Sequence, residues 1–372
     1  MRASWAELSE LADLISRLVA IESVNPDLVP SGAGEAEIAQ FVASWLRESG
    51  LDVIVLEPVA GRPSVVGVLR GAGGGRSLML NAHMDTVGAG GMENPFTPIL
   101  RDGRVYGRGA YDMKASLAAI MMAARDASAM RLQGDLIVAA VADEEVASIG
   151  TSATIEHIRA DAAIVTEPTE LHLCLAHKGF VWLEVETHGV AAHGSRADIG
   201  VDAIAHMGSV LTGVLDLNER LRGRPAHRLL GTGSIHASLI EGGQEMSTYP
   251  ARCVAKLERR TLPGEDGRTC LAELEQLIHG ENASARVFLE RPPSELAPDH
   301  PLSTVVAEAA GHPEVVGAAY WMDMALLNAA GTPAVAFGPT GAGAHADVEW
   351  VDLASVERCA GVYARVAQLW CT

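Results

Sequence analysis

The chain of 372 residues is longer than one hydrophobic core usually organises, so its length predicts two domains. Hydrophobic residues make up 48% and charged residues 20%, which excludes a largely disordered protein. The formal net charge of -19 opposes binding to nucleic acid or to an anionic membrane, and no run of Lys and Arg offsets it. The five cysteines are scattered and never form a Cys-x-x-Cys pair, so they predict neither a disulfide framework nor a thiolate zinc site.

The N-terminal stretch has the composition of a globular protein. Acidic residues occur too early for a secretory signal, and no run of about 18 apolar residues could span a membrane. We therefore expect a cytoplasmic protein. Apolar residues recur at helical spacing over residues 4–20 and 36–49, and residues 51–56 and 64–69 have the composition of strands. The glycines of residues 71–75 lack the spacing of a phosphate-binding loop, so a turn is expected there.

His83 and Asp85 follow the apolar run Leu78-Met79-Leu80. Side chains two residues apart on a strand point to the same face, so both would emerge together where a buried strand meets solvent. Such a pair can form half of a metal site. A His and a nearby Asp taken alone are more often a hydrogen-bonded loop pair, so a metal site depends on what the rest of the chain supplies.

Further carboxylates follow other apolar runs. Asp112 precedes a helix expected over residues 113–129, where the helix dipole would stabilise an anion. The run at residues 135–142 is typical of a strand buried on both faces, and it ends in the three adjacent acids 143–145, for which a solvated turn is the alternative. A shorter apolar run ends at Glu167. Ligands of open α/β sheets gather at the carboxyl ends of strands, so these acids are candidate ligands.

The pattern then changes to that of an α+β fold. Period-two alternation over residues 181–187 predicts an antiparallel strand with one wet face, and an amphipathic helix follows over residues 200–221. Three further strands and a second helix complete a four-stranded antiparallel sheet with two helices. The last segment returns to the α/β pattern. We therefore expect an α/β domain of residues 1–175 and 292–372, interrupted by an inserted domain of residues 176–291.

The candidate ligands are imidazoles and carboxylates without a thiolate, a set that suits Zn²⁺, Co²⁺ or Mn²⁺. One ion needs only three protein ligands and an open position, so the larger number of donors indicates two ions. These donors are His83, Asp85, Asp112, Glu144, Glu145, Glu167 and His345.

Five segments of the chain resemble, in sequence and in their order, motifs of the M20 metallopeptidase family. This family includes acetylornithine deacetylase, succinyl-diaminopimelate desuccinylase, aminoacylase and glutamate carboxypeptidase. The resemblance implies a catalytic domain with a mixed sheet flanked by helices, and an inserted lid or dimerisation domain. It extends over nearly the whole chain. The segments are residues 82–87, 107–114, 143–146, 166–168 and 345–351.

The resemblance also implies a ligand set for two divalent metal ions. His83 and Glu167 would hold one ion, Glu145 and His345 would hold the other, and Asp112 would bridge them. Zinc is the expected metal, with cobalt and manganese as alternatives.

Other residues receive roles without binding metal. Asp85 would orient the imidazole of His83, and Glu144 would be the general base that moves a proton from water to the leaving amine. His193 would reach into the partner subunit's site and stabilise the oxyanion, although the residue alone is an ordinary loop histidine. Arg260 falls where the family has a carboxylate-binding arginine, and a surface strand arginine is the alternative. Ser247 lies in the expected substrate-binding segment, where many members have Asn, so detailed specificity does not transfer.

The expected function is therefore removal of the acyl group from an N-acyl amino acid, as in acetylornithine deacetylase. Within the resemblance, Glu167 favours this function, because the dipeptidase-like branches of the family often have Asp at that position. A dipeptidase or carboxypeptidase of the same family is the alternative, acting on a short peptide. A metal-binding protein without catalysis is a third reading, which the presence of Glu144 disfavours. The expected partners are a small-molecule substrate and a second copy of the chain, bound through the inserted domain.

Overall fold

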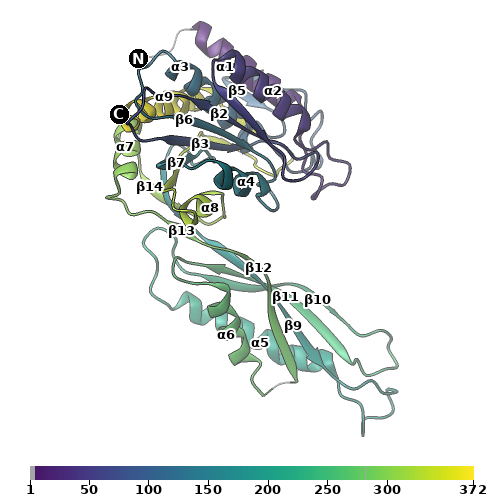
Figure 1. Ribbon diagram of the computed structural model, residues 1–372. Helices are drawn as coiled ribbons and strands as arrows, with labels where there is room; N and C mark the ends of the chain where they lie inside the picture. The colour runs from purple at the N-terminus through teal and green to yellow at the C-terminus, as the bar shows by residue number, and fades with distance from the viewer. Residues whose placement is uncertain (1–4, 281) are drawn as a thin grey trace. The chain divides into compact units, whose positions relative to one another are not determined.

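The computed structural model describes residues 5–280 and 282–372, and Figure 1 follows them from the N-terminus to the C-terminus. The chain divides into two compact units. Unit 1 consists of Met1–Leu175, Leu296–Val316 and Met322–Thr372. Unit 2 consists of Ala176–Glu295 and Gly317–Trp321.

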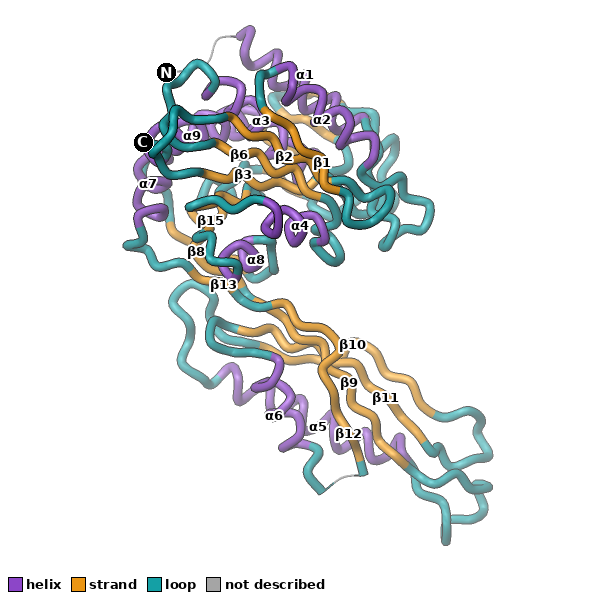
Figure 2. Tube along the Cα trace, in the orientation of Figure 1, coloured by secondary structure: helices purple, strands orange, loops and turns teal. Residues whose placement is uncertain are grey.

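Most of a nine-stranded mixed sheet lies in unit 1 (Figure 2), whereas its short edge strand β13 falls within the residues of unit 2. The strand order is β1-β2-β6-β3-β7-β15-β8-β13, and β14 also pairs with β8. Strands β6, β3, β7 and β15 are parallel neighbours, and both β1 and β6 pair antiparallel with β2. The strands span Asp52–Leu56 (β1), Ser64–Leu69 (β2), Leu78–His83 (β3), Leu136–Val141 (β6), Ala162–Val165 (β7), Leu173–His177 (β8), Ser294–Glu295 (β13), Val315–Ala318 (β14) and Ala334–Ala336 (β15).

Helices cover both faces of this sheet, with α3 and α9 on one face and α4 and α8 on the other (Figure 1). Helix α3 is buried along nearly its whole length because its many alanines let the sheet and α9 approach closely. The predicted mixed sheet flanked by helices is therefore confirmed. The helices are α1 (Trp5–Ala20), α2 (Ala36–Glu48), α3 (Ala115–Ala127), α4 (Ile149–His157), α7 (Pro301–Ala310), α8 (Met324–Ala329) and α9 (Leu353–Trp370).

A second, small sheet of unit 1 has the strand order β16-β17-β5-β4. It was not expected from the sequence. Strands β4 and β5 form a hairpin around Asp102 and Gly103, which both have positive φ values of 53° and 72°. A two-residue Asp-Gly turn favours this geometry because glycine adopts positive φ without strain. The strands span Ile99–Arg101 (β4), Arg104–Tyr106 (β5), Gly341–Ala342 (β16) and Trp350–Asp352 (β17).

Unit 2 is the predicted four-stranded antiparallel sheet with two helices, in the order β10-β11-β9-β12. Helices α5 and α6 pack on one face, where the apolar side chains of alternate strand positions form the core. Within the described residues, no helix of the protein is long and apolar enough to cross a membrane. The elements span Gly179–His188 (β9), Ala203–Arg222 (α5), Ser234–Gly242 (β10), Arg252–Thr261 (β11), Gly267–Leu277 (α6) and Ala283–Arg291 (β12).

Candidate metal centre

Three adjacent parallel strands, β6, β3 and β7, end at the same edge of the large sheet. Strand β3 ends at His83, β6 leads into Glu144 and Glu145, and β7 leads into Glu167. Because parallel strands present their carboxyl ends together, residues far apart in the sequence meet at this edge. The apolar side chains of these strands are fully buried, which fixes where each strand ends.

The imidazole of His83 is buried and held in one orientation. Its Nδ1 lies 2.9 Å from the main-chain oxygen of Asp85, and that oxygen can only accept a proton, so Nδ1 donates. Its Nε2 lies 3.1 Å from Oδ1 of Asp112 and 3.7 Å from Oε1 of Glu167. The nitrogen that faces these carboxylates is therefore the one available to a metal ion.

The carboxylate of Asp85 acts mainly on the neighbouring main chain. Its Oδ1 and Oδ2 accept hydrogen bonds from the backbone amides of Glu144 and Glu145 at 3.1 and 3.2 Å, and it lies 3.6 Å from Nδ1 of His83. Burial raises the pKa of Asp85, but the interaction with His83, followed by hydrogen bonds from Asn25 and the Glu144 amide, outweighs it and lowers the pKa. Asp85 thus fixes the segment that carries the two adjacent glutamates.

A second group of candidate ligands lies around His345. Its Nε2 lies 3.2 Å from Oε2 of Glu145 and 3.5 Å from Oδ2 of Asp112. These two carboxylates raise the pKa of His345 to about 10. Asp112 therefore contacts both histidines, one with each oxygen, as a bridging ligand would.

The donors fit divalent metal ions. One ligand atom each of His83, Glu144 and Glu167 lie within 4.8 Å of one another, and the same holds for His83, Asp112 and Glu145. Burial, and then mutual repulsion, raise the pKa values of the three glutamates. Oε1 of Glu145 is also buried without a hydrogen-bond partner among the described residues. Divalent cations would compensate this concentration of buried oxygen ligands, and the absence of a thiolate favours hard or borderline ions.

Asp112 does not lie at the start of a regular helix, so that expectation was wrong. Residues Ala110–Lys114 form a wide turn in which Asp112 and Met113 have non-helical φ and ψ, and α3 begins only at Ala115. Glu349 explains the deviation, because its carboxylate accepts hydrogen bonds from the amides of Gly109, Tyr111 and Asp112 at 2.8–3.0 Å.

Glu349 was not singled out from the sequence, although it lies in the segment that begins with His345. It is buried, and it forms an ion pair of 2.7 Å with the equally buried Arg108. Pairing of β17 with β5 brings Glu349 against the loop that carries Asp112. Glu349 and Asp112 are 237 positions apart in the sequence. A contact over such a distance leaves no local pattern from which it could be predicted.

Glu349→Gln should weaken metal binding at least about tenfold and lower the melting temperature, because it weakens the anchoring of the Asp112 loop and leaves Arg108 buried without its charged partner. Metal titration and thermal unfolding measure the two effects. Glu314→Gln removes an exposed acid of the same unit and should change neither. Metal affinity equal to that of the wild type would contradict this role of Glu349.

The three adjacent acids, residues 143–145, diverge into different surroundings. Asp143 is buried and accepts hydrogen bonds from Arg62 at 2.8 Å and from Asn25 at 2.9 Å. The same Asn25 amide group donates to Asp85 at 2.8 Å. The expected repulsion between neighbouring acids is thus relieved by a buried guanidinium. Asn25 and Arg62 are supporting residues that sequence reasoning missed.

Asp323 is a further buried carboxylate that the sequence did not indicate. Oγ1 of Thr151 donates a hydrogen bond of 2.5 Å to it, and burial raises its pKa to about 6. Its charge raises the pKa values of both Glu144 and Glu167, which places it beside the candidate centre.

Comparison with known proteins decides the family. The family model of peptidase family M20/M25/M40 matches residues 79–369, which is most of the chain. The chain belongs to peptidase family M20. The family predicted from the sequence is thereby confirmed, and membership identifies the protein as a hydrolase of the metallopeptidase type.

Solved structures of M20 proteins share the fold over nearly the whole chain. The chain is similar to aminopeptidase PepT from Bacillus cereus, with a TM-score of 0.82, 19% identity and coverage of 98% of this chain and 99% of that one. It is similar to the metallo-carboxypeptidase Sso-CP2 from Sulfolobus solfataricus, with a TM-score of 0.77, 17% identity and coverage of 97% and 99%. It is also similar to the YXEP protein of Bacillus subtilis, described as a dinuclear metal-binding peptidase, with a TM-score of 0.74, 16% identity and coverage of 98% and 99%. At these identities the likeness establishes the fold alone.

The remaining candidate residues of the M20 protein, His193, Ser247 and Arg260, lie in unit 2. The structure brings His193 and Ser247 together. Nδ1 of His193, an exposed residue, lies 2.8 Å from Oγ of Ser195. The His193 segment pairs with the segment after β10 through a bridge to Thr248 and a hydrogen bond of 2.7 Å from the Gly194 amide to the Ser247 carbonyl. His193 and Ser247 thus share one pair of loops.

Arg260 lies elsewhere in the same unit. The paired loops adjoin the Arg252 end of β11, where the Gly189 amide donates to the Ala251 carbonyl, whereas Arg260 is near the other end of that strand. Eight residues of extended strand span about 26 Å. His193 and Arg260 of one chain therefore cannot contact the same small molecule.

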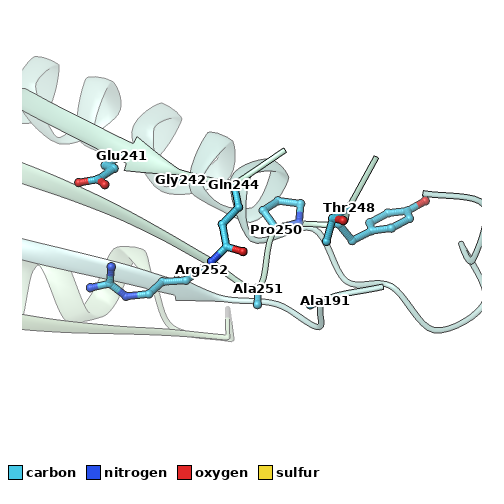
Figure 3. Close-up of a pocket in the computed structure, with 10 residues that line it drawn as sticks. Ala191, Glu241, Gly242, Gln244, Thr248, Pro250, Ala251 and Arg252 are labelled. Carbon is cyan, nitrogen blue, oxygen red and sulfur yellow. The ribbon is translucent and has the colours of Figure 1, made fainter. Parts of the chain in front are cut away.

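A cavity of about 300 Å³ opens beside the paired loops, between the end of β10 and the start of β11 (Figure 3). Glu241, Gln244, Thr248 and Arg252 contribute its polar lining, and Ser247 is not among its lining residues. Arg252 is already engaged, since its guanidinium forms an ion pair of 2.8 Å with Glu186.

Proposed function

We propose that this M20 hydrolase removes the acyl group from an N-acyl amino acid. The observation that carries the proposal is the group of His83, Glu144 and Glu167, in which the partly buried Glu144 offers a carboxylate suited to proton transfer beside two buried candidate ligands. The choice of an N-acyl amino acid over a peptide rests on the motif resemblance, in which Glu167 is typical of the deacylase branches. Arg260 supports a substrate that carries a free carboxylate.

The proposed ligands are His83 and Glu167 for one divalent ion and Glu145 and His345 for the other, with Asp112 between them. Zinc is the proposed metal, and cobalt and manganese are the alternatives. When bound, such ions polarise the scissile carbonyl and lower the pKa of water towards about 7. Asp85 and Glu349 hold the two ligand-bearing segments in place through main-chain hydrogen bonds.

Glu144 is proposed to move the proton. It shares its group with His83 and Glu167, and its amide is anchored on Asp85. From this position its carboxylate accepts a proton from the attacking water and donates it to the leaving nitrogen. Glu144 lies as close to His83 and Glu167 as a ligand would, so its assignment as the base requires a measurement of metal content.

Unit 2 is proposed to be the lid or dimerisation domain of a homodimer. The placement of the two residues supports the proposal, because His193 lies in the loops at the Arg252 end of β11 and Arg260 lies about 26 Å further along that strand. Both residues can then act on one substrate if they come from different subunits. His193 would donate a hydrogen bond to the oxyanion in the partner's site.

His193→Ala should lower kcat about 10²–10³-fold and leave the melting temperature unchanged, because it removes one oxyanion donor from an exposed loop. Steady-state kinetics and thermal unfolding measure the two effects. His279→Ala replaces another exposed histidine of unit 2 and serves as the control. Mixed with Glu144→Gln subunits, the His193→Ala subunits should recover activity, and an unaffected rate in the single variant would contradict the oxyanion role.

A panel of N-acyl amino acids and dipeptides, supplied with Zn²⁺ or Co²⁺, tests the proposed reaction. We expect amine release from N-acetyl amino acids at a kcat/KM well above that for dipeptides with the same carboxyl-terminal residue. The reverse order would identify the protein as a dipeptidase or carboxypeptidase.

A further inference from the structure

One face of the unit 2 sheet is not covered by the helices of that unit. Helices α5 and α6 lie together on the opposite face (Figure 1). The uncovered face carries Phe180 and Trp182 from β9, Glu258 and Arg260 from β11, and Phe288 from β12, all on positions that alternate with core residues or lie at a bulge. We call these five residues the aromatic face.

Three rings of the aromatic face form a continuous series. The ring centroids of Phe180 and Trp182 are 5.4 Å apart, and those of Trp182 and Phe288 are 5.9 Å apart. Trp182 and Phe288 remain 38% and 39% exposed. Aromatic residues make up only 4% of the chain, yet three of them meet on this face. Such a series of half-exposed rings is typical of a surface that binds a ligand or a partner.

Arg260 is held at one end of this series with its binding groups free. Its guanidinium carbon lies 5.2 Å from the centroid of the Phe180 ring, and its Nε donates to Oε1 of Glu258 at 2.7 Å. Oε2 of the same carboxylate accepts a hydrogen bond of 3.0 Å from the indole of Trp182. Within the described part of the chain, Nη1 and Nη2 of Arg260 donate no hydrogen bond, so this edge of the guanidinium can bind a carboxylate.

We propose that the aromatic face selects substrates whose carboxylate-bearing residue has an aromatic or large apolar side chain. The inference rests on the proposed function, in which Arg260 binds the substrate carboxylate. An amino acid bound to Nη1 and Nη2 of Arg260 directs its side chain over neighbouring positions of the same face. Trp182 and Phe288 occupy these positions with exposed rings. An apolar ring of the substrate that covers them buries more apolar surface, which favours binding.

Charges on the face disfavour the alternative side chains. Lys256 extends over the ring of Phe288, with its Nζ 5.6 Å from the centroid, so Lys256 and Arg260 together repel a basic side chain such as that of ornithine. The acids nearby are already paired, Glu258 with Arg260 and Glu184 with Arg286. A small side chain would leave the rings exposed. An aromatic or large apolar residue is the class that fits.

The test compares N-acetyl-L-phenylalanine with N-acetyl-L-alanine and N-acetyl-L-ornithine in the metal-loaded enzyme. We expect the wild type to prefer the phenylalanine derivative at least about tenfold in kcat/KM. Trp182→Ala and Phe288→Ala should each lower kcat/KM for this substrate about tenfold and change that for the alanine derivative less than about threefold. Leu215→Ala, which removes an exposed side chain from α5, should change neither.

A binding measurement separates recognition from catalysis. Calorimetric titration of N-acetyl-L-phenylalanine into metal-loaded Glu144→Gln protein should show a Kd that Trp182→Ala weakens about tenfold. Trp182→Phe keeps the ring and loses the hydrogen bond to Glu258, so it should retain the preference even if Trp182→Ala proves unstable. Equal losses for both substrates, or a preference for the ornithine derivative, would overturn the inference.

Failure of the proposed function gives a different result. In that case no N-acyl amino acid releases amine while dipeptides are cleaved. The same variants are then compared on dipeptides that end in phenylalanine or alanine, so the aromatic face is tested in either reaction.

Discussion

Glu144→Gln should lower kcat about 10²–10⁴-fold and leave the metal content of the protein unchanged. The substitution keeps the shape of the side chain and removes the group that accepts the proton. Its amide would remain anchored on Asp85, so the neighbouring Glu145 keeps its position. Turnover of an N-acetyl amino acid and metal analysis of the purified protein measure the two quantities.

Glu145→Gln is the matched comparison, because it alters the adjacent glutamate, which contacts His345. We expect this variant to lose metal together with activity. Loss of metal from Glu144→Gln, with full metal in Glu145→Gln, would mean that the roles of the two glutamates are exchanged.

Removal of the metal should abolish activity and lower the melting temperature by about 5 °C or more. The reference is the protein at a free metal concentration about a thousandfold above the Kd for that metal. The reason is the buried carboxylates of Asp112, Glu144, Glu145 and Glu167, whose repulsion only a cation compensates fully. Chelation followed by thermal unfolding measures the shift, and readdition of Zn²⁺ or Co²⁺ should restore both properties.

Asp112→Asn is the control for this experiment, because Asp112 contacts both histidines. Its melting temperature should respond much less to added metal. An identical melting temperature with and without metal in the wild type would show that the carboxylates hold no ion.

The architecture could be predicted from hydrophobic patterns where elements are long. The buried run that became β6 and the alternation that became β9 each have a distinct period, and both strands lie where the pattern places them. The small sheet of β4, β5, β16 and β17 was missed because strands of two or three residues show no period. Only the Asp102-Gly103 turn signalled part of it.

The candidate ligands could be predicted because each follows a strand or a recognisable motif. The residues that hold them could not. Glu349 reaches the Asp112 loop through the pairing of β17 with β5, and Arg62 reaches Asp143 across 81 residues. Long-range contacts of this kind depend on the tertiary fold, and a lone buried acid or arginine has the same local sequence as an exposed one.

The contacts within the aromatic face likewise could not be predicted from the local sequence. Alternation over residues 181–187 predicted one wet face, and in the structure the strand begins at Gly179, so that Phe180 shares this face with Trp182. The contact of Trp182 with Phe288 required the pairing of β9 with β12, and the orientation of Arg260 required Glu258 as its partner.

Amine release from N-acetyl-L-amino acids by metal-free protein, recorded before and after addition of Zn²⁺ or Co²⁺, tests the central claim most directly. The account predicts no release above the blank from the metal-free protein and sustained release after the metal is added, with Glu144→Gln inactive under both conditions. Release by the metal-free protein at the full rate, or none from any N-acyl substrate at saturating metal, would contradict it.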